Sequence, residues 1–547
     1  GSVHGSQVAH TSPLHDETFP DETRGIMLAT VASATLLGVD GRGVWVEVHV
    51  SKMGLPRFVM VGLPDAACRE SRDRIRAAIL NAGLTFSGSE VVTVNLAPSG
   101  LRKSGSALDL PIAIAYLVAS GQLDAAAVEN TGLLGGLGLD GTVRGVRGVL
   151  PLVEATAAPR VVVPSENAAE AQLSDRQILV GTTLAEVVAA LACEERWPDP
   201  PELTVPQVTP GPDLSEVRGH RVAKLAIEVA AGGGHHLLML GPPGSGKTML
   251  AQRSIGLLPN LDSDRGAEVI RVHSAAGLLF GRASSAGNGA AAGPLRRGAE
   301  GELVVVAPFR APHHTATVVS LVGGGSGQMR PGEVSLAHGG VLFLDELAEF
   351  PAHALDALRQ PLEDGAIRVS RAHATVSFPA RCLLVAAMNP CPCGSGTPER
   401  CRCSEPALRR YARRISGPLL DRFDLRVRVE ALAPEELVDA PAGEPSAQVA
   451  ERVARARAAA RGRGVAANRE LDLEALEHHT RLTPGAREVL DQALRSGRLS
   501  GRGMARLRAV ALTLRDLGGA DGTLDEATMQ VALGLRAEVG IQLMAVA

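Results

Sequence analysis

The chain has few aromatic residues, few lysines and few cysteines, and each shortage excludes a class of protein. Its 547 residues include 9 Phe, 2 Tyr and 2 Trp, too few for a surface that stacks successive nucleic-acid bases on aromatic rings. Seven cysteines in a chain of this length do not make a disulfide framework. Every apolar run is far shorter than the ~18 residues that span a bilayer, so we expect no membrane segment.

The overall charge is nearly balanced. The chain holds 55 basic and 59 acidic residues, a formal net charge of −4, and 45% hydrophobic residues. This composition excludes a largely disordered chain and a protein that binds nucleic acid through its overall charge. Lysine occurs only at positions 52, 103, 224 and 247, against 51 arginines, so each remaining lysine is a candidate for a specific role.

Two proline-rich stretches divide the chain. The first, 197–213, has six prolines in 17 residues and predicts an interdomain linker, as does the second at 433–446. Residues 27–196 and 214–432 each alternate strand-like and helix-like patterns, and 447–547 predicts helices only. Residues 1–26 are interpreted as a tag or polar leader without the apolar segment of an export signal, which predicts a cytoplasmic protein.

A glycine-rich loop in the second α/β region predicts a nucleotide site. The segment GPPGSGKT follows the apolar strand HHLLML and precedes a helix, the context that a P-loop requires. Its backbone N–H groups can surround phosphates, Lys247 can reach the β- and γ-phosphates, and Thr248 can hold Mg²⁺. The residues of the loop are Gly241, Pro242, Pro243, Gly244, Ser245, Gly246, Lys247 and Thr248.

Polar residues after two further apolar strands predict the hydrolytic groups. GVLFLDEL places Asp345 and Glu346 at a strand end, where Asp345 can orient Mg²⁺ and Glu346 can polarise the attacking water. CLLVAAMN places Asn389 in the same position, either to hold that water or to cap the strand. Arg422, in GPLLDRFDL, is either half of a structural ion pair or a finger presented to a neighbouring subunit's γ-phosphate.

Four of the seven cysteines lie together in CPCGSGTPERCRC. Two close pairs separated by a loop can place four thiolates around Zn²⁺, although zinc pairs more often have two intervening residues. Reduced unligated thiols and redox-active pairs are the alternatives, and structural zinc is the favoured interpretation. The predicted ligands are Cys391, Cys393, Cys401 and Cys403.

The long strings around these motifs resemble the YifB/ComM family of magnesium-chelatase-like AAA+ ATPases. They are GPPGSGKT, FRAPHHTATVVSLVGGG (309–325), GEVSLAHGGVLFLDEL (332–347) and SGPLLDRFDL (416–425). The resemblance covers nearly all of 27–547. It implies an α/β chain with a Lon-like α+β domain at 27–196, an AAA+ P-loop core with a helix-2 insert at 214–432, and a C-terminal helical lid at 447–547.

The resemblance also implies roles for residues outside the P-loop. Residues 363–381 match the hairpin before sensor 1, with Arg371 near its tip, and the hairpin and insert would line the pore of a homohexamer. Arg422 matches the trans-acting arginine finger. Sensor 2 is expected at Arg506, with Arg502 as the alternative. His313 and His314 are candidate pore contacts, and the sequence leaves their role open.

The N-terminal domain resembles a Lon protease but lacks the protease's reactive pair. Aligning SGLRKSGSALDLPIA (99–113) with the catalytic segment puts Ala107 at the nucleophile's position. Leu150 stands where the partner lysine would be, and Ser106 is one residue out of register. A Ser–Lys dyad needs both groups. We therefore expect a non-catalytic domain.

The resemblance implies an ATP-driven DNA motor that promotes branch migration in recombination or transformation, with recombination proteins as partners. The cysteine cluster is commoner in YifB-like than in ComM-like members. Nine arginines between 400 and 430, and the run Arg452, Arg455, Arg457, Arg461 and Arg463, are candidate phosphate contacts or solvated helix faces. A protein-remodelling motor and a chelatase-like motor subunit are the rival interpretations.

Overall fold

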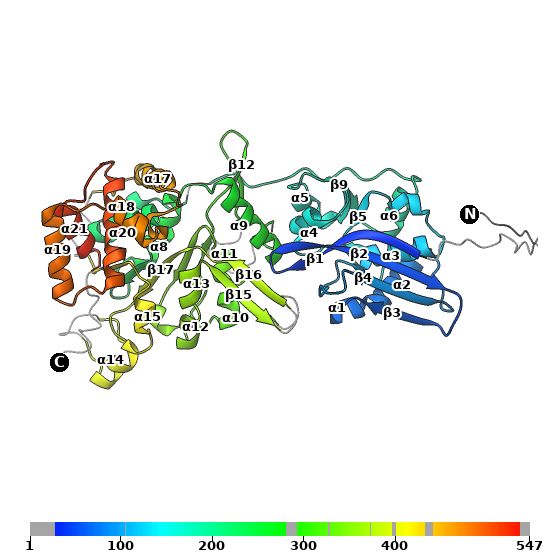
Figure 1. Cartoon of the computed structure of the whole chain (residues 1–547), viewed down its shortest axis with the longest axis horizontal. Coiled ribbons are helices and arrows are strands. Elements are labelled where there is room, and N and C mark those ends of the chain that lie inside the picture. The colour runs from blue at the N-terminus through cyan, green and yellow to red at the C-terminus, as the bar shows by residue number, and fades with distance from the viewer. Residues whose placement is uncertain are drawn as a thin grey trace, which may run out of the picture.

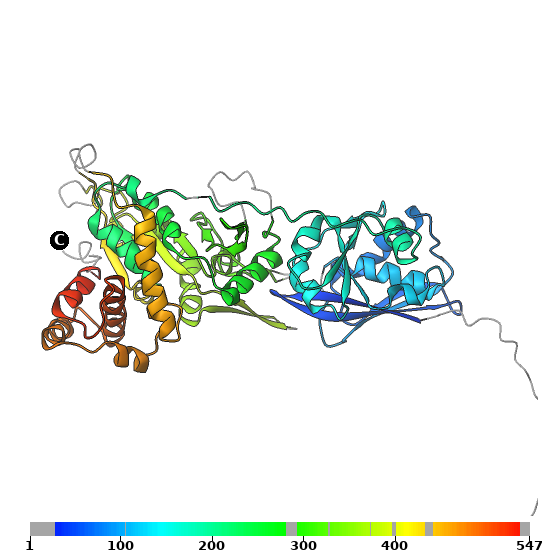
Figure 2. The same ribbon diagram turned by 90° about the horizontal axis from the view of Figure 1, so that it is seen from above.

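The computed structural model describes residues 28–103, 105–209, 211–280, 293–325, 329–371, 374–395, 401–432 and 441–536. Two α/β bodies and a group of helices follow one another along an elongated molecule (Figures 1 and 2). In the part of the chain that is described, no helix combines the length and the apolar character needed to cross a membrane.

A seven-stranded mixed sheet forms the N-terminal body, in the order β3-β4-β2-β1-β5-β8-β9. Its centre is the antiparallel pair β1 and β2, and alternate residues of β2 from Val44 to Val50 face the core, as the two-residue period of a strand requires. Every residue of α3 is buried, which fits a helix that is apolar all round. The strands are β1 (Leu28–Leu37), β2 (Asp40–Ser51), β3 (Arg57–Val61), β4 (Val91–Ala97), β5 (Thr131–Leu133), β6 (Gly136–Leu137), β7 (Val143–Arg144), β8 (Arg160–Pro164) and β9 (Gln177–Gly181), and the helices are α1 (Ala66–Arg69), α2 (Ser71–Asn81), α3 (Asp109–Ala119), α4 (Val149–Ala155), α5 (Ala168–Ala171) and α6 (Leu184–Leu191).

Five parallel strands form the sheet of the second body, in the order β13-β14-β17-β10-β18. β10, β14 and β17 are buried at every position, as expected of parallel strands covered on both faces. Segments that follow the strands gather at one edge of the sheet, here called the carboxyl edge, and segments that precede them gather at the opposite, amino edge. The strands are β10 (Leu237–Leu240), β11 (Leu295–Arg297), β12 (Leu303–Val305), β13 (Phe309–Arg310), β14 (Val341–Leu344), β15 (Ala366–Arg371), β16 (Ala374–Pro379), β17 (Leu383–Met388) and β18 (Leu425–Arg428), and the helices are α7 (Arg221–Gly233), α8 (Lys247–Arg253), α9 (Ser263–Ala276), α10 (Val318–Val322), α11 (Glu333–Leu336), α12 (Ala352–Asp356), α13 (Arg359–Asp364), α14 (Glu405–Ala412) and α15 (Gly417–Leu420).

Four of the five C-terminal helices given below begin at side-chain caps that the sequence supplies, and α17 follows Pro445 instead. Asp472, Thr483, Ser500 and Asp525 each accept a hydrogen bond from a backbone N–H of the first turn that follows, which satisfies a donor that the helix itself leaves unpaired. The helices are α17 (Ser446–Gly462), α18 (Leu473–His479), α19 (Pro484–Arg495), α20 (Gly501–Leu517) and α21 (Glu526–Gly534).

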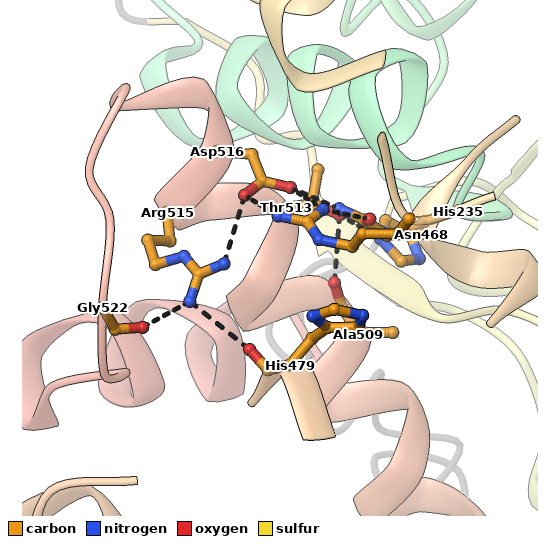
Figure 3. A network of polar contacts seen from close by, with 9 residues as sticks. His235, Asn468, His479, Ala509, Thr513, Arg515, Asp516 and Gly522 are labelled. Atoms are coloured by element: carbon orange, nitrogen blue, oxygen red, sulfur yellow. Dashed lines mark hydrogen bonds and ion pairs between the residues drawn. The ribbon is translucent and has the colours of Figure 1, made fainter. Parts of the chain in front are cut away.

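A buried polar network joins these helices to the core at its amino edge (Figure 3). His235, directly before β10, places Nε2 2.9 Å from Thr513 Oγ1 on α20. Asn468 donates to the same hydroxyl at 3.1 Å and to Asp516 Oδ2 at 2.8 Å. The described C-terminal helices are thus docked on the edge opposite to the P-loop. The C-terminal helical part that the sequence predicted is therefore present, and its action as a lid stays a prediction.

The N-terminal body packs directly on the second body. One hydrophobic cluster contains Leu36 of β1 together with Val376 and Phe378 of the β15–β16 hairpin. At Gly38, in the β1–β2 turn, an added Cβ would lie only 2.1 Å from Val376 Cγ1. The hairpin that was predicted to line a pore is therefore held on one side by the N-terminal domain.

The proline-rich segment between the two bodies has few contacts but is anchored. It runs along one side of the molecule in Figure 1 without helix or strand. Val205 is buried against Leu279 and Leu295, and Val208 N donates to Arg297 O at 3.0 Å. These contacts fix the second half of the segment to the β11–β12 hairpin.

Candidate active site

The glycine-rich loop lies at the carboxyl edge, between β10 and α8. Gly244 and Gly246 have φ angles of +76° and +83°, which L-residues with a side chain adopt only with strain. At Gly241 an added Cβ would lie 2.0 Å from Val429 O. The glycines of the motif are therefore required by the course of the backbone, which curls tightly before α8 begins at Lys247.

Lys247 is almost fully buried in this loop. Its Nζ donates to Gly241 O and Pro242 O, each at 2.8 Å, and lies 3.4 Å from Asn389 Oδ1. Burial lowers the pKa of Lys247, and the nearby Asp345 carboxylate opposes that shift. The ammonium group is held in the centre of the loop, where the phosphates of a nucleotide would need a positive charge.

The two predicted magnesium ligands are in contact. Thr248 Oγ1 donates to Asp345 Oδ2 at 2.7 Å, so a hydroxyl and a carboxylate meet beside the loop. Oxygen atoms of this kind are the ligands that Mg²⁺ prefers. Thr248 and Asp345 therefore fit the role of magnesium ligands, and they would hold the ion if it were bound.

Glu346 follows Asp345 in a strained backbone conformation. Its φ is +50°, and its N–H donates to Asp345 Oδ1 at 2.9 Å. The carboxylate is about half exposed, and its Oε2 lies 3.2 Å from His314 Nδ1. A left-handed conformation at a non-glycine residue is typical of functional sites. It turns this carboxylate away from Asp345, toward the end of β13.

His313 and His314 do not lie on the β15–β16 hairpin. They follow β13 at the carboxyl edge, with their rings 4.0 Å apart, and His313 Nδ1 lies 2.9 Å from Thr315 Oγ1. The structure thus places His314 against Glu346, and a pore contact by either histidine stays a prediction. Arg371 ends β15 at the hairpin turn, and its side chain lies outside the described residues.

Asn389 is fixed from two sides. Besides the approach of Lys247 to its side chain, its carbonyl accepts a hydrogen bond from Tyr411 Oη at 3.0 Å. Burial raises the pKa of Tyr411 above its usual range, which keeps the phenol neutral and able to donate. The sequence did not single out Tyr411, because a tyrosine on a helix 22 residues away carries no local signal.

Arg422 and Arg506 lie at the amino edge, away from the glycine-rich loop of the same chain. The guanidinium of Arg422 is 8% exposed and is paired with Glu363 on α13. Arg506 Nε lies 3.4 Å from Asp424 Oδ1. Of the two interpretations of Arg422, the ion pair is present within this subunit. A role at a nucleotide requires the nucleotide of another chain.

Asp424 is the buried centre of the amino edge. It is 1% exposed, and Arg469 Nε donates to its Oδ2 at 2.8 Å. Burial alone would raise the pKa of Asp424, but Arg469, His235 and His236 together hold it well below its usual range. The carboxylate stays charged and orders the arginines around it, including Arg506.

The four clustered cysteines converge as the spacing predicted. Their sulfur atoms all lie within 4.8 Å of one another, with Cys391 Sγ 3.4 Å from Cys393 Sγ. Cys391 is buried, Cys393 is exposed, and Cys401 and Cys403 are half-buried. This group could hold a metal ion, and the other three cysteines lie apart from it.

The positions matched to a protease dyad are both apolar and buried. Ala107 is 8% exposed and Leu150 is 4% exposed. A methyl group and an isobutyl group supply neither a nucleophile nor a base. The two side chains of a dyad are thus missing at these positions, and the lack of protease activity stays a prediction.

The basic run on α17 is largely engaged within the chain. Arg452 pairs with Glu228 and Glu444, and Arg463 Nη1 lies 2.6 Å from Asp516 Oδ2. Arg457 Nε donates to Ala231 O at 2.8 Å, and burial lowers its pKa to about 10. These arginines dock the C-terminal helices, so most of this run is not a free phosphate-binding face.

Three family models match the chain in succession. The model described as "Subunit ChlI of Mg-chelatase" matches 46–167. That described as "Magnesium chelatase, subunit ChlI" matches 213–437. The model described as "Magnesium chelatase, subunit ChlI C-terminal" matches 443–536. Together they cover both α/β bodies and the C-terminal helices.

Known proteins are similar over almost the whole length. The competence protein ComM of Haemophilus influenzae is 41% identical over 525 residues, which cover 94% of this chain and 98% of that protein. A protein of Escherichia coli named YifB is 40% identical over 514 residues, covering 93% and 97%. An uncharacterized protein of Mycobacterium tuberculosis is 44% identical over 502 residues, covering 90% and 95%.

Proposed function

The chain belongs to the YifB/ComM family of magnesium-chelatase-like AAA+ proteins, and on that premise we propose that it is a ring-forming motor that hydrolyses ATP to act on DNA. Membership implies an ATPase motor that uses nucleotide and Mg²⁺. We propose further that the chain assembles as a homohexamer. We also propose that it acts on branched or single-stranded DNA in recombination.

One observation carries the ATPase part of the proposal. Lys247, Thr248, Asp345 and Asn389 meet at the carboxyl edge through contacts of 2.7 to 3.4 Å, and Glu346 stands beside them. In this arrangement Lys247 neutralises phosphate charge and Glu346 orients and deprotonates the attacking water. Thr248 and Asp345 would hold Mg²⁺, which would supply positive charge that stabilises the phosphates. Asn389 holds the water in line.

The separation of the arginines supports a ring. Arg422 and Arg506 lie at the amino edge, and strand direction places that edge opposite the loop that would bind ATP. In a closed ring the amino edge of one subunit can meet the carboxyl edge of the next. Arg422 is then the finger, and Arg506 the sensor, for the neighbour's γ-phosphate. The Glu363 carboxylate holds the Arg422 side chain until that contact forms.

DNA is proposed as the substrate on the strength of the resemblance and of one relative's name, competence protein. With 13 aromatic residues in the chain, contact would be made to phosphates by arginines such as the exposed Arg402, Arg410 and Arg413, and Arg371 is proposed to contribute at the hairpin tip. Such contacts are independent of base sequence and strongly dependent on salt. Both properties suit a motor that moves along DNA.

The test compares ATP turnover with no polymer, with single-stranded DNA, with a four-way junction and with an unfolded protein. We expect both DNAs to raise the rate, with the stimulation falling steeply as salt is added. A rate raised by unfolded protein and indifferent to DNA would replace this proposal with protein remodelling. Porphyrin metallation restored by this chain in cells lacking a chelatase motor would replace it with the chelatase role.

The four-cysteine cluster is proposed to hold Zn²⁺. Four sulfur atoms within 4.8 Å of one another form the donor set of structural zinc sites. The proposal is independent of DNA binding, because elemental analysis of the purified protein tests it directly. About one zinc per chain is the expected result.

A further inference from the structure

The four-cysteine cluster adjoins the candidate active site. Cys391 comes two residues after Asn389 and is 4% exposed, so the chain enters the cluster directly from the end of β17. A metal ligand at this point restricts the position of Asn389, because the two residues are joined by a short, partly buried backbone segment.

The cysteine loop also packs against the P-loop. Gly394 has a φ of +77°, and an added Cβ would lie 2.8 Å from both Cδ and Cγ of Pro243. Its N–H donates to Cys391 O at 3.0 Å. The turn after the first cysteine pair therefore leaves no room for a methyl group between itself and the loop that would bind ATP.

The second cysteine pair leads back to the same asparagine. After Cys403 the chain forms α14, whose buried Tyr411 donates to Asn389 O at 3.0 Å. Asn389 is therefore held by the segment that enters the cluster and by the helix that leaves it. An ion that binds both cysteine pairs would therefore connect the two segments that hold Asn389.

The sulfur geometry fits zinc. A tetrahedral ion with Zn–S bonds of about 2.3 Å needs sulfur atoms about 3.8 Å apart. Cys391 Sγ and Cys393 Sγ are 3.4 Å apart, and Cys393 Sγ and Cys401 Sγ are 3.8 Å apart. The first pair follows β17 and the second precedes α14, so binding an ion adds a second link between segments that the Tyr411–Asn389 hydrogen bond already connects.

We propose that the four cysteines hold a structural zinc ion that fixes Asn389 and the P-loop relative to each other, so that ATP turnover by this chain depends on the ion. The cluster is thus a positioning element of the nucleotide site rather than a DNA-reading finger, because its described contacts lead to Pro243 and Asn389. This inference rests on the ATPase part of the proposed function and not on DNA.

The test measures three quantities in the full-length protein without DNA. They are zinc content by elemental analysis, affinity for a fluorescent ATP analogue, and the rate of ATP hydrolysis. Cys403→Ser removes one half-buried ligand. Gly394→Ala keeps all four thiolates but pushes the turn away from Pro243. Gly497→Ala is the matched control, because Gly497 also has a positive φ, +72°, but an added Cβ there meets nothing within 4 Å.

We expect Cys403→Ser to lose its zinc and to bind and turn over ATP about tenfold less well, as loss of an outer positioning contact typically costs. Gly394→Ala is expected to keep its zinc and still lose turnover to a similar extent. Gly497→Ala should match the wild type in all three quantities. The Gly394 variant keeps the test decisive if the serine variant fails to fold.

Several results would overturn the inference. One is zinc-free protein that hydrolyses ATP at the wild-type rate. Another is Gly394→Ala protein with wild-type turnover. A wild-type protein without any ATPase activity would count against the proposed function instead. In that case, nucleotide affinity that is unchanged by loss of zinc would overturn this inference separately.

Discussion

Thr248 Oγ1 donates a 2.7 Å hydrogen bond to Asp345 Oδ2 across 97 residues of sequence. The hydroxyl lies in the first turn of α8 and the carboxylate follows β14, so the segments after β10 and β14 meet at the same edge of the sheet. The parallel sheet thereby brings together two oxygen atoms of the kind that Mg²⁺ prefers.

Glu346→Gln is expected to bind ATP normally and to hydrolyse it at least about 100-fold more slowly, because the amide cannot accept a proton from the attacking water. Nucleotide affinity and turnover measured on the same preparation separate the two steps. Glu349→Gln is the matched control. Glu349 lies three residues after Glu346, is half-exposed and pairs with Arg414. Substantial turnover in the Glu346 variant would remove this residue from the water-activating role.

Arg422→Ala is expected to lower turnover by about 10³-fold, because an arginine finger neutralises charge that develops in the transition state. Lys247→Ala is expected to be inactive for a different reason, the loss of the phosphate contact in its own loop. Mixing the two inactive proteins should restore part of the activity. At some interfaces an intact loop then faces an intact Arg422.

The mixing experiment has a clear control and a clear contradiction. Arg409→Ala removes an exposed arginine that pairs only locally, with Glu405, and should behave as wild type. If mixed Arg422 and Lys247 variants stay inactive while wild-type subunits exchange freely, Arg422 acts within its own chain, and its pair with Glu363 is its whole role.

Much of this site could be predicted from sequence because parallel strands gather their following residues at one edge. That rule predicts that Lys247, Asp345, Glu346 and Asn389 lie at one edge, and in the structure Lys247 approaches Asn389 while Glu346 follows Asp345 beside Thr248. The same rule applies to His314, which follows the two-residue strand β13. So short a strand leaves no readable alternation, and the sequence therefore left the role of the two histidines open.

The docking of the C-terminal helices could not be predicted in the same way. Their caps and periodicity are local properties and are legible in the sequence. Their position depends on buried pairs such as Arg469 with Asp424 and His235 with Thr513, whose partners lie 45 and 278 residues apart. The sequence therefore predicted a C-terminal helical domain but not the surface on which it docks.

Asp424→Asn is expected to destabilise the protein by about 3 kcal/mol, because it removes the buried carboxylate that pairs with the partly buried Arg469 and Arg506. Urea unfolding measures the loss, and limited proteolysis should show earlier release of the C-terminal helices. Asp421→Asn is the control, since Asp421 is 64% exposed and its pair with Arg426 is 3.7 Å long. Equal stability of the two variants would exclude Asp424 as the centre of the docking contact.

Glu170 makes the contact between the two α/β bodies sensitive to pH. It accepts a hydrogen bond from Ser274 on α9, and burial raises its pKa above the ordinary value of 4.5. Between the ordinary and the raised value the folded protein holds a proton that the unfolded chain has lost, so stability falls as pH rises through that window.

Glu170→Gln removes this titration while it keeps the shape of the side chain. We expect the stability of wild type relative to the variant to decrease as the pH rises above the ordinary glutamate value of 4.5, as measured by urea unfolding at several pH values. Glu154→Gln is the control, because Glu154 forms a partly exposed pair with Arg271 at the same junction. A difference between wild type and Glu170→Gln that does not change with pH would contradict the burial argument.

The most direct test of the proposed motor is the disassembly of a four-way DNA junction in the presence of ATP. Wild-type protein is expected to release labelled duplex products with ATP and Mg²⁺, and to release none with a non-hydrolysable ATP analogue. Glu346→Gln protein should bind the junction and leave it intact. Junctions that stay intact with an active, ring-forming ATPase would contradict action on branched DNA, and disassembly by Glu346→Gln would show that ATP hydrolysis does not drive it.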